Sequence, residues 1–100
     1  MEFEWDENKN RRNVEKHKIN FEEAKTIFDD PDAIEMEASR NGEYRIIRIG
    51  KTATKFILLV VYTLRGLVVR LISARQADKN ERNLYIEHKF KRHDDESSNG

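Results

Sequence analysis

The chain has no cysteine, one proline, four glycines and no net charge. Without cysteine it can form no disulfide scaffold, cysteine-ligated zinc site, haem attachment or thiol nucleophile. The longest apolar run, Phe56 to Tyr62, is far shorter than the roughly 20 residues that span a bilayer. The acidic N-terminus lacks the pattern of a signal peptide. We therefore expect a soluble, cytoplasmic protein that does not bind a membrane.

A length of 100 residues leaves room for one domain. Charged residues make up 38% of the chain and apolar residues 37%, so folding must depend on a few strongly apolar segments. We assign residues 1–91 to the domain. Residues 92–100 contain no apolar side chain, and we expect them to form a disordered polar tail.

The zero net charge conceals segments of opposite sign. Residues 19–43 hold two basic and eight acidic side chains, whereas residues 44–93 hold twelve lysines and arginines against three acids. A basic stretch of this size can attract a phosphate backbone. The alternative is an ordinary solvated surface, with its counter-charges folded alongside.

Strand and helix signals follow one another in the order β-α-α-β-β-β-β-α. Asp6 is a predicted N-cap, Asn20 and Glu23 form a capping box, and Asn41-Gly42 predicts a hairpin. Short connections between the later strands predict an α+β fold, with a twisted, mainly antiparallel sheet and helices on one face. The expected elements are Phe3–Trp5, Glu7–His17, Phe21–Asp29, Ala33–Ala38, Glu43–Gly50, Lys55–Thr63, Leu67–Arg75 and Asp78–Lys91.

Metal and serine chemistry have little support in the sequence. His17, His88 and His93 are scattered and do not match the spacing of zinc or calcium ligands. Ser73 lies inside a strand pattern and lacks the glycine-flanked turn of a serine nucleophile. We predict no metal and no cofactor.

The remaining polar residues fit metal-free RNA cleavage. That reaction needs a base for the 2′-hydroxyl, cations for the charge on the pentacoordinate phosphate, and an acid for the leaving oxygen. Arginine suits the second role because its planar fork meets two phosphate oxygens. The candidates are Arg45, Arg48, Arg70 and Arg75 on neighbouring strands, Glu81 and Tyr85 on the last helix, and His17 on the first.

Each candidate also has a structural interpretation. Arg70 can pair with Glu81 at the sheet, His17 can stabilise a helix C-terminus, and Tyr85 can be a core aromatic. For any residue taken singly, the structural interpretation is the better one. The combination of several arginines with a carboxylate favours a functional role.

Several motifs in sequence order resemble the BrnT toxins. The resemblance covers residues 2–86 and departs after His17, where the family usually has glycine and this chain has Lys18. The matching segments are Phe3-Glu-Trp5-Asp6, Lys9, Asn13, Lys16-His17, Phe21-Glu-Glu-Ala24, Phe28, Asp30-Pro31, Arg48-Ile-Gly50, Val61-Tyr-Thr63 and Arg70-Leu-Ile-Ser-Ala-Arg75, with Glu81 and Tyr85 behind them.

The resemblance implies a ribonuclease toxin of a type II toxin–antitoxin pair with a RelE-like fold. It would cleave RNA without a metal, inhibit translation and be neutralised by a BrnA-like antitoxin, whose complex with the toxin would bind operator DNA. The alternative is a non-enzymatic module that binds nucleic acid or the antitoxin through a basic sheet. The resemblance implies phosphate binding by Arg70 and Arg75, together with Arg45 or Arg48. It implies base catalysis by His17 or Glu81, and substrate positioning or acid catalysis by Tyr85 or Lys16. Lys9 would be a further substrate-binding residue.

Overall fold

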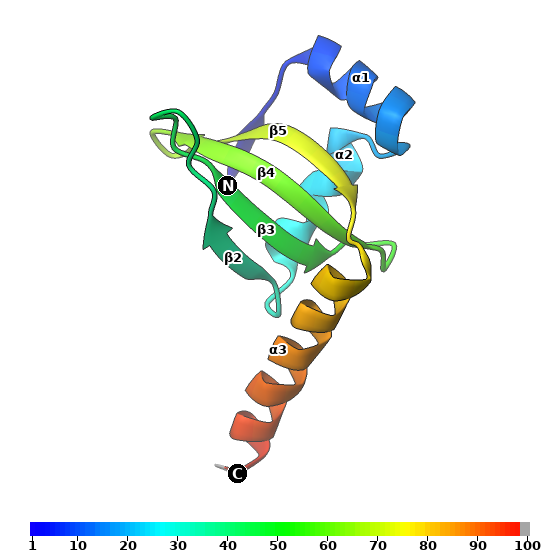
Figure 1. The fold of residues 1–100 in the computed structure, drawn as a ribbon, viewed down its shortest axis with the longest axis vertical. Helices are drawn as coiled ribbons and strands as arrows, with labels where there is room; N and C mark the ends of the chain where they lie inside the picture. Colours follow the sequence, from blue (N-terminus) through cyan, green and yellow to red (C-terminus); the bar gives the residue numbers. More distant parts are fainter. Residues whose placement is uncertain (99–100) are drawn as a thin grey trace.

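The computed structural model describes residues 1–98, which form a five-stranded mixed sheet and three α-helices (Figure 1). The strand order is β1-β5-β4-β3-β2, with β1 parallel to β5 and every other neighbouring pair antiparallel. The predicted α+β class and element order are confirmed. The elements are β1 (Glu2–Glu4), α1 (Glu7–His17), α2 (Phe21–Ala24), the 3-10 helix η1 (Lys25–Asp29), β2 (Ile34–Glu37), β3 (Ile46–Lys51), β4 (Ile57–Arg65), β5 (Val68–Gln76) and α3 (Lys79–Ser98).

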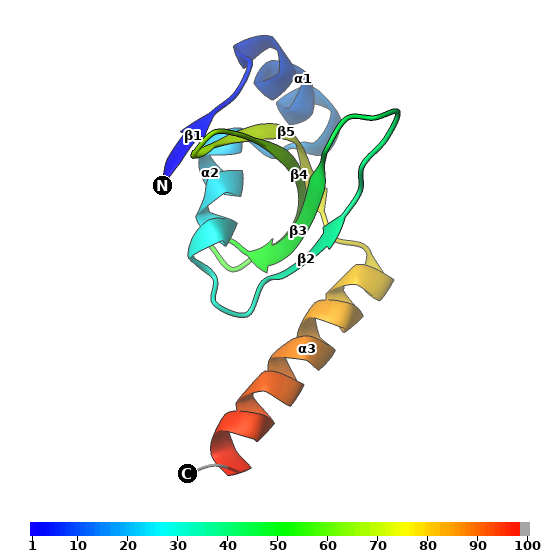
Figure 2. The ribbon, with the colours of Figure 1, turned by 90° about the vertical axis from the view of Figure 1, so that its left-hand side faces the viewer.

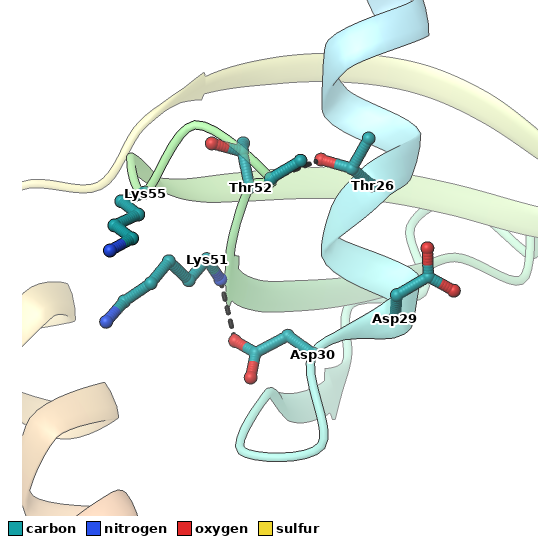
Figure 3. Close-up of a pocket in the computed structure, with 7 residues that line it drawn as sticks. Thr26, Asp29, Asp30, Lys51, Thr52 and Lys55 are labelled. Atoms are coloured by element: carbon teal, nitrogen blue, oxygen red, sulfur yellow. Dashed lines mark hydrogen bonds between the residues drawn. The ribbon is translucent and has the colours of Figure 1, made fainter.

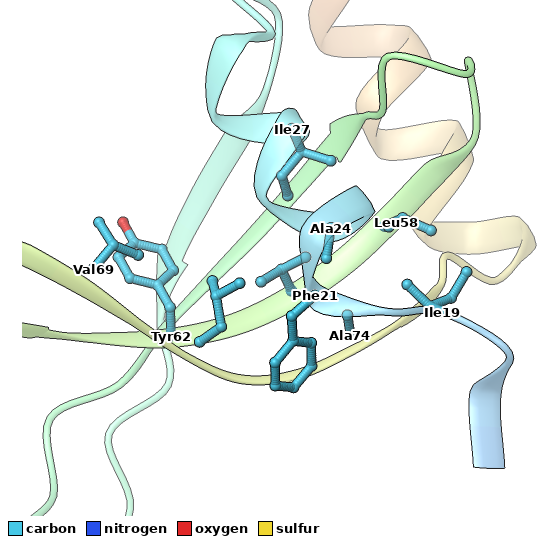
Figure 4. Close-up of a cluster of buried hydrophobic side chains, with 10 residues drawn as sticks. Ile19, Phe21, Ala24, Ile27, Leu58, Tyr62, Val69 and Ala74 are labelled. Atoms are coloured by element: carbon cyan, nitrogen blue, oxygen red, sulfur yellow. The ribbon is translucent and has the colours of Figure 1, made fainter. Parts of the chain in front are cut away.

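The inner face of the sheet curves around α2 and η1 (Figure 2). Phe21, Ala24 and Ile27 follow each other at helical spacing, and their side chains are fully buried there. Burial of each of the two larger side chains, Phe21 and Ile27, contributes about 1.5–3 kcal/mol to the stability of the fold. Gly50 permits the close approach of η1, because a Cβ atom at this position would lie 3.1 Å from Ile27 Cβ. The core on this face comprises Ile19, Phe21, Ala24, Ile27, Leu58, Val60, Tyr62, Val69, Leu71 and Ala74 (Figure 4).

The second helix begins as predicted but has a different form. Asn20 Oδ1 accepts a hydrogen bond from Glu23 N at 2.8 Å, which is half of the expected capping box. The Glu23 carboxylate does not return to Asn20 but accepts a hydrogen bond from the Thr54 hydroxyl. The predicted single helix over 21–29 is one α-turn followed by a 3-10 helix that ends before Pro31, since the residue before a proline disfavours the α conformation.

The outer face of the sheet has a smaller apolar core of its own. Strand alternation points Ile49 and Leu59, which are register partners, to this side, where they pack with Ala77 and Tyr85. The prediction that helices cover one face is therefore wrong for α3. After the β3–β4–β5 meander the chain continues into α3 on the face of the sheet opposite α2. Tyr85 of α3 completes the second core there.

The hairpin between β2 and β3 forms at the predicted Asn41-Gly42. Both residues have positive φ, at 52° and 77°, and Arg40 and Glu43 form a bridge across the turn. This agrees with the conformational requirement of the tight hairpin turn.

The last helix is longer than the sequence predicts. It ends at Ser98 rather than Lys91, so residues 92–98 of the expected disordered tail are helical, while residues 99–100 lie outside the described residues. Arg92 Nη1 donates to Asp32 Oδ1 at 2.6 Å, and His93 Nε2 lies 3.1 Å from the same oxygen. This anchor to the loop after η1 holds the helix past its predicted end, and the helix projects away from the sheet (Figure 1).

Candidate functional site

One buried side chain attaches α1 to the edge of the sheet. Asn13 Nδ2 donates to the carbonyl oxygens of Ile19 and Ala74, each at 2.8 Å, and its Oδ1 accepts from Ala74 N at 3.0 Å. Because β1 pairs with β5 only over residues 68–70, Ala74 has no strand neighbour on that side. The Asn13 amide takes the place of a strand by pairing with both backbone groups of Ala74.

Local signals fix the length and orientation of α1. Asp6 Oδ1 accepts hydrogen bonds from Asn8 N and Lys9 N at its N-terminus, and these bonds lower the pKa of Asp6. The helix ends at His17, and the C-cap residue Lys18 has a left-handed φ of 62°. Lys18 thus adopts the conformation for which glycine is usual at this position.

The α1 pocket is a shallow depression of about 300 Å³ between α1 and the edge of β5. Its basic side chains come from one side of the helix, at spacings of three and four residues. None of them makes an ion pair within 4 Å with a carboxylate of the described residues. The pocket is lined by Lys9, Arg12, Asn13, Lys16, His17, Ile72 and Ser73.

Three of the predicted site residues thus come together in this pocket: Lys9, Lys16 and His17. Sequence reasoning missed Arg12, Asn13 and Ser73. Arg12 lies three residues after Lys9, and this helical spacing was the signal that could have found it. The long-range pairing of Asn13 with Ala74 has no such local signal, because 61 residues separate them.

The four strand arginines do not form one cluster. Arg48 points to the inner face, where it donates to the carbonyl oxygens of Ile27 and Asp30 and lies 5.0 Å from the Phe28 ring centre. Arg70 and Arg75 lie on β5 at the outer face, and Arg45 precedes β3. Each is paired with a carboxylate: Arg45 with Glu43 at 2.9 Å, Arg48 with Glu35 at 3.2 Å, Arg70 with Glu4 at 3.5 Å and Arg75 with Glu81 at 2.8 Å.

The expectation of a shared basic sheet surface is therefore wrong. Alternation along β3 sends Arg48 to the opposite side of the sheet from Ile47 and Ile49. The suggested pairing of Arg70 with Glu81 is also wrong, because Glu81 binds Arg75.

Glu81 is engaged in two structural interactions. Both of its oxygens accept from the Arg75 guanidinium at 2.8 Å, and it forms a reciprocal capping box with Asp78 at the start of α3. The hydrogen bonds from Arg75 lower the pKa of Glu81 and raise that of Arg75. A carboxylate with a lowered pKa is a weak base, which favours His17 over Glu81 for proton abstraction.

Tyr85 is a core residue. It is only 1% exposed, and its hydroxyl donates to Asp30 Oδ2 at 2.7 Å. Burial, together with this bond to a carboxylate, raises the pKa of Tyr85. The structural interpretation of Tyr85 is supported, because its ring is buried in the core and its hydroxyl is held by a carboxylate.

A second polar pocket, of about 340 Å³, lies between η1 and the β3–β4 turn (Figure 3). Lys51 N donates to Asp30 Oδ2, and Ala53 N donates to the Thr26 hydroxyl. These bonds attach the turn to η1, and none of the residues predicted for the site lies here.

Within the described part of the chain, no group of three histidine, aspartate or glutamate side chains is placed to hold a metal ion. No helix among the described residues is sufficiently long and apolar to cross a membrane.

The molecule is thus an α+β protein in which a basic helix is held at the free edge of a five-stranded sheet. The family model described as the ribonuclease toxin BrnT of type II toxin–antitoxin systems matches residues 5–81. The chain belongs to this family.

A solved structure supports the fold assignment. The 1.1 Å crystal structure of the ribonuclease toxin BrnT of Brucella abortus is similar with a TM-score of 0.64 and 24% sequence identity. The similarity covers 79% of this chain and 99% of the Brucella chain. Among curated proteins, none matches this chain significantly.

Proposed function

We propose that this chain is a cytoplasmic toxin that cleaves RNA without a metal ion, inhibits translation and is neutralised by a BrnA-like antitoxin. Membership of the BrnT family supports ribonuclease activity and an antitoxin partner. The observation that carries the proposed site is the α1 pocket, whose four basic side chains have no ion partner among the described residues, while the strand arginines are held by carboxylates. We further propose that the fold is RelE-like and that operator DNA is bound only by the complex with the antitoxin.

The side chains of the α1 pocket suit transesterification of RNA. His17 takes the proton of the 2′-hydroxyl, since histidine can exchange a proton near neutral pH. The resulting oxyanion attacks the adjacent phosphorus, which forms a cyclic phosphate and breaks the bond to the 5′-oxygen. Lys16 donates a proton to that leaving oxygen.

The charge of the pentacoordinate phosphate requires cations in fixed positions. Lys9 and Arg12 lie on the same helix as His17, one to two turns earlier, and α1 is fixed to β5 through Asn13. Arg75 follows Ser73 by two residues on β5, so both point to the outer face. We assign phosphate binding to Lys9 and Arg12, and also to Arg75, the outer-face arginine of β5 that is nearer to Ser73 in the strand.

A non-enzymatic module is the second candidate. It is favoured by the pairing of all four predicted strand arginines with carboxylates, because arginines engaged in ion pairs are not available to stabilise a transition state. This module would bind RNA or the antitoxin in a salt-dependent manner without strand scission.

Cleavage of a single-stranded RNA in the presence of EDTA separates the two candidates. The wild-type chain should cleave, and His17→Ala should reduce the rate by about a hundredfold or more, as expected for loss of a general base. Lys79→Ala is the matched control, because it removes an exposed lysine outside the pocket. RNA binding without cleavage by the wild type would establish the second candidate instead.

Expression in growing cells gives the physiological readout. Induction of the wild type should arrest growth and protein synthesis, and His17→Ala should not. Full arrest by a folded His17→Ala protein would remove His17 from the mechanism.

A further inference from the structure

The outer face contains an apolar groove that the proposed reaction does not use. The groove, of about 380 Å³, lies between α3 and the β3–β4 strands. Its apolar lining is formed by Ile57, Tyr85, Ile86 and Phe90. Lys51, Lys89 and His93 supply its polar rim. We call it the α3 groove.

Two apolar side chains of the α3 groove are open to solvent. Phe90 is 68% exposed and Ile86 is 41% exposed, and their spacing of four residues places them on one side of α3. Exposed apolar patches rimmed by polar side chains are typical of interaction sites. The family match ends at residue 81, so most of the groove is formed by chain beyond the matched domain.

The charge of the rim restricts the type of partner. No carboxylate is among the described residues that line the groove. Lys51 makes no ion pair with a described carboxylate, and Lys89 Nζ is 4.0 Å from Asp32. A segment with apolar side chains flanked by carboxylates would therefore complement both the lining and the rim.

RNA fits this surface less well than a protein segment does. Phe90 is the one strongly exposed aromatic side chain in its described lining, and the aliphatic side chains of Ile57 and Ile86 beside it offer neither a stacking partner for a base nor a donor for a phosphate. The α1 pocket lies at the other end of the molecule, with α1 and α3 at opposite ends of the long axis (Figure 1). A ligand in the groove would therefore not contact the residues of the α1 pocket.

We propose that the α3 groove binds an amphipathic helix of the antitoxin, in which apolar side chains enter the groove and carboxylates face Lys51 and Lys89. The inference rests on the proposed function, since that function supplies the partner. The groove acts as an anchor distant from the α1 pocket, so antitoxin affinity and RNA cleavage depend on different residues.

Separation of these two properties is the test. The probe is the small protein encoded by the reading frame adjacent to this gene, titrated into the full chain by calorimetry. Phe90→Glu should raise its Kd by about tenfold or more, as for a central apolar anchor, with RNA cleavage unchanged. The matched control is Leu84→Glu, which alters a 50% exposed residue that lines a different depression beside Ile34, and its Kd should stay within about threefold of wild type.

The charge complementarity is tested with Lys51→Glu. It should weaken binding at low salt and flatten the salt dependence of Kd, because an attraction to carboxylates is lost. Circular dichroism of each variant verifies that α3 is intact.

Four results would overturn the inference. These are wild-type affinity in Phe90→Glu, no binding of the adjacent protein to wild type, loss of RNA cleavage in Phe90→Glu, and a wild-type dimer that Phe90→Glu converts to a monomer. The third would make the groove an RNA site and the fourth a self-association surface. Failure of wild type to cleave RNA would instead contradict the proposed function, and the binding comparison would still be interpretable.

Discussion

The basic residues of α1 and those of the sheet differ in what surrounds them. Lys9, Arg12, Lys16 and His17 face a shallow pocket with no described carboxylate within 4 Å. The strand arginines each have such a partner, which comes from the next strand, a hairpin or a helix start. Counted along the sequence, the excess of positive charge lies in the strand segments. The positive side chains without a described carboxylate partner lie instead on α1, although residues 1–18 sum to zero.

The difference has a topological cause. Strand pairing brings side chains from distant segments to within a few ångströms, so an acidic segment such as β2 neutralises β3 directly across the ladder, as in the register pair Glu35 and Arg48. A helix at a sheet edge has a solvent-facing side with no such neighbour. Unpaired cations on that side retain their full attraction for phosphate.

The largest expected effect comes from separating α1 from the sheet. Asn13→Ala removes three buried hydrogen bonds, two of them to Ala74, and should lower the free energy of unfolding by about 3 kcal/mol. Denaturant titration measures this loss. Asn8→Ala, at an exposed position of the same helix, should change stability by less than about 0.5 kcal/mol.

Asn13 also positions the α1 pocket, so its loss should affect catalysis in protein that is still folded. At a temperature where both proteins are folded, RNA cleavage by Asn13→Ala should fall by about tenfold or more, because a displacement of about 1 Å is enough for such losses. Wild-type cleavage rates in the folded variant would show that the position of α1 does not matter to the reaction.

The pairing of Glu81 with Arg75 should produce a smaller effect, visible in acid. The pKa of Glu81 is lowered from its ordinary value of 4.5, mainly by the bonds from Arg75. A carboxylate with a lowered pKa in the folded state contributes stability that is complete above that ordinary value and is lost as pH falls through the folded pKa. The melting temperature of Glu81→Gln should therefore decline less steeply than that of wild type as pH falls below about 5.

Glutamine isolates the charge, because it can keep the capping bond to Asp78 N. Glu22→Gln, at an exposed pair with Lys25, serves as the reference substitution and should follow the wild-type acid profile. Parallel profiles for Glu81→Gln and wild type would mean that the Arg75 pair contributes little to stability. Asp32 adds to the acid sensitivity of both proteins, since burial raises its pKa but the bonds from Arg92 and His93 outweigh burial and lower it.

The fold was more predictable than the site. Caps, alternation and the Asn41-Gly42 turn are local signals, and they gave the order of all eight predicted elements correctly. The face on which α3 packs and the partner of each arginine depend on contacts between distant segments, such as Tyr85 with Asp30 across 55 residues. The helical spacing of Lys9, Lys16 and His17 was visible in the sequence, but it could not show that the described part of the chain places no carboxylate beside them.

The smallest expected effect tests the sheet side of the comparison directly. Arg70 lies 3.5 Å from Glu4 on β1 and outside the α1 pocket, so Arg70→Ala should change the rate of RNA cleavage by less than about threefold. The pair is a peripheral ion pair, which contributes about 0–1 kcal/mol, so the melting temperature should also change little. Arg12→Ala, assayed beside it, should reduce cleavage by about tenfold, because it removes an unpaired cation from the pocket. A large loss of RNA cleavage in Arg70→Ala, with wild-type stability, would show that the sheet forms part of the active site. Arg70 would then have to separate from Glu4 when RNA binds.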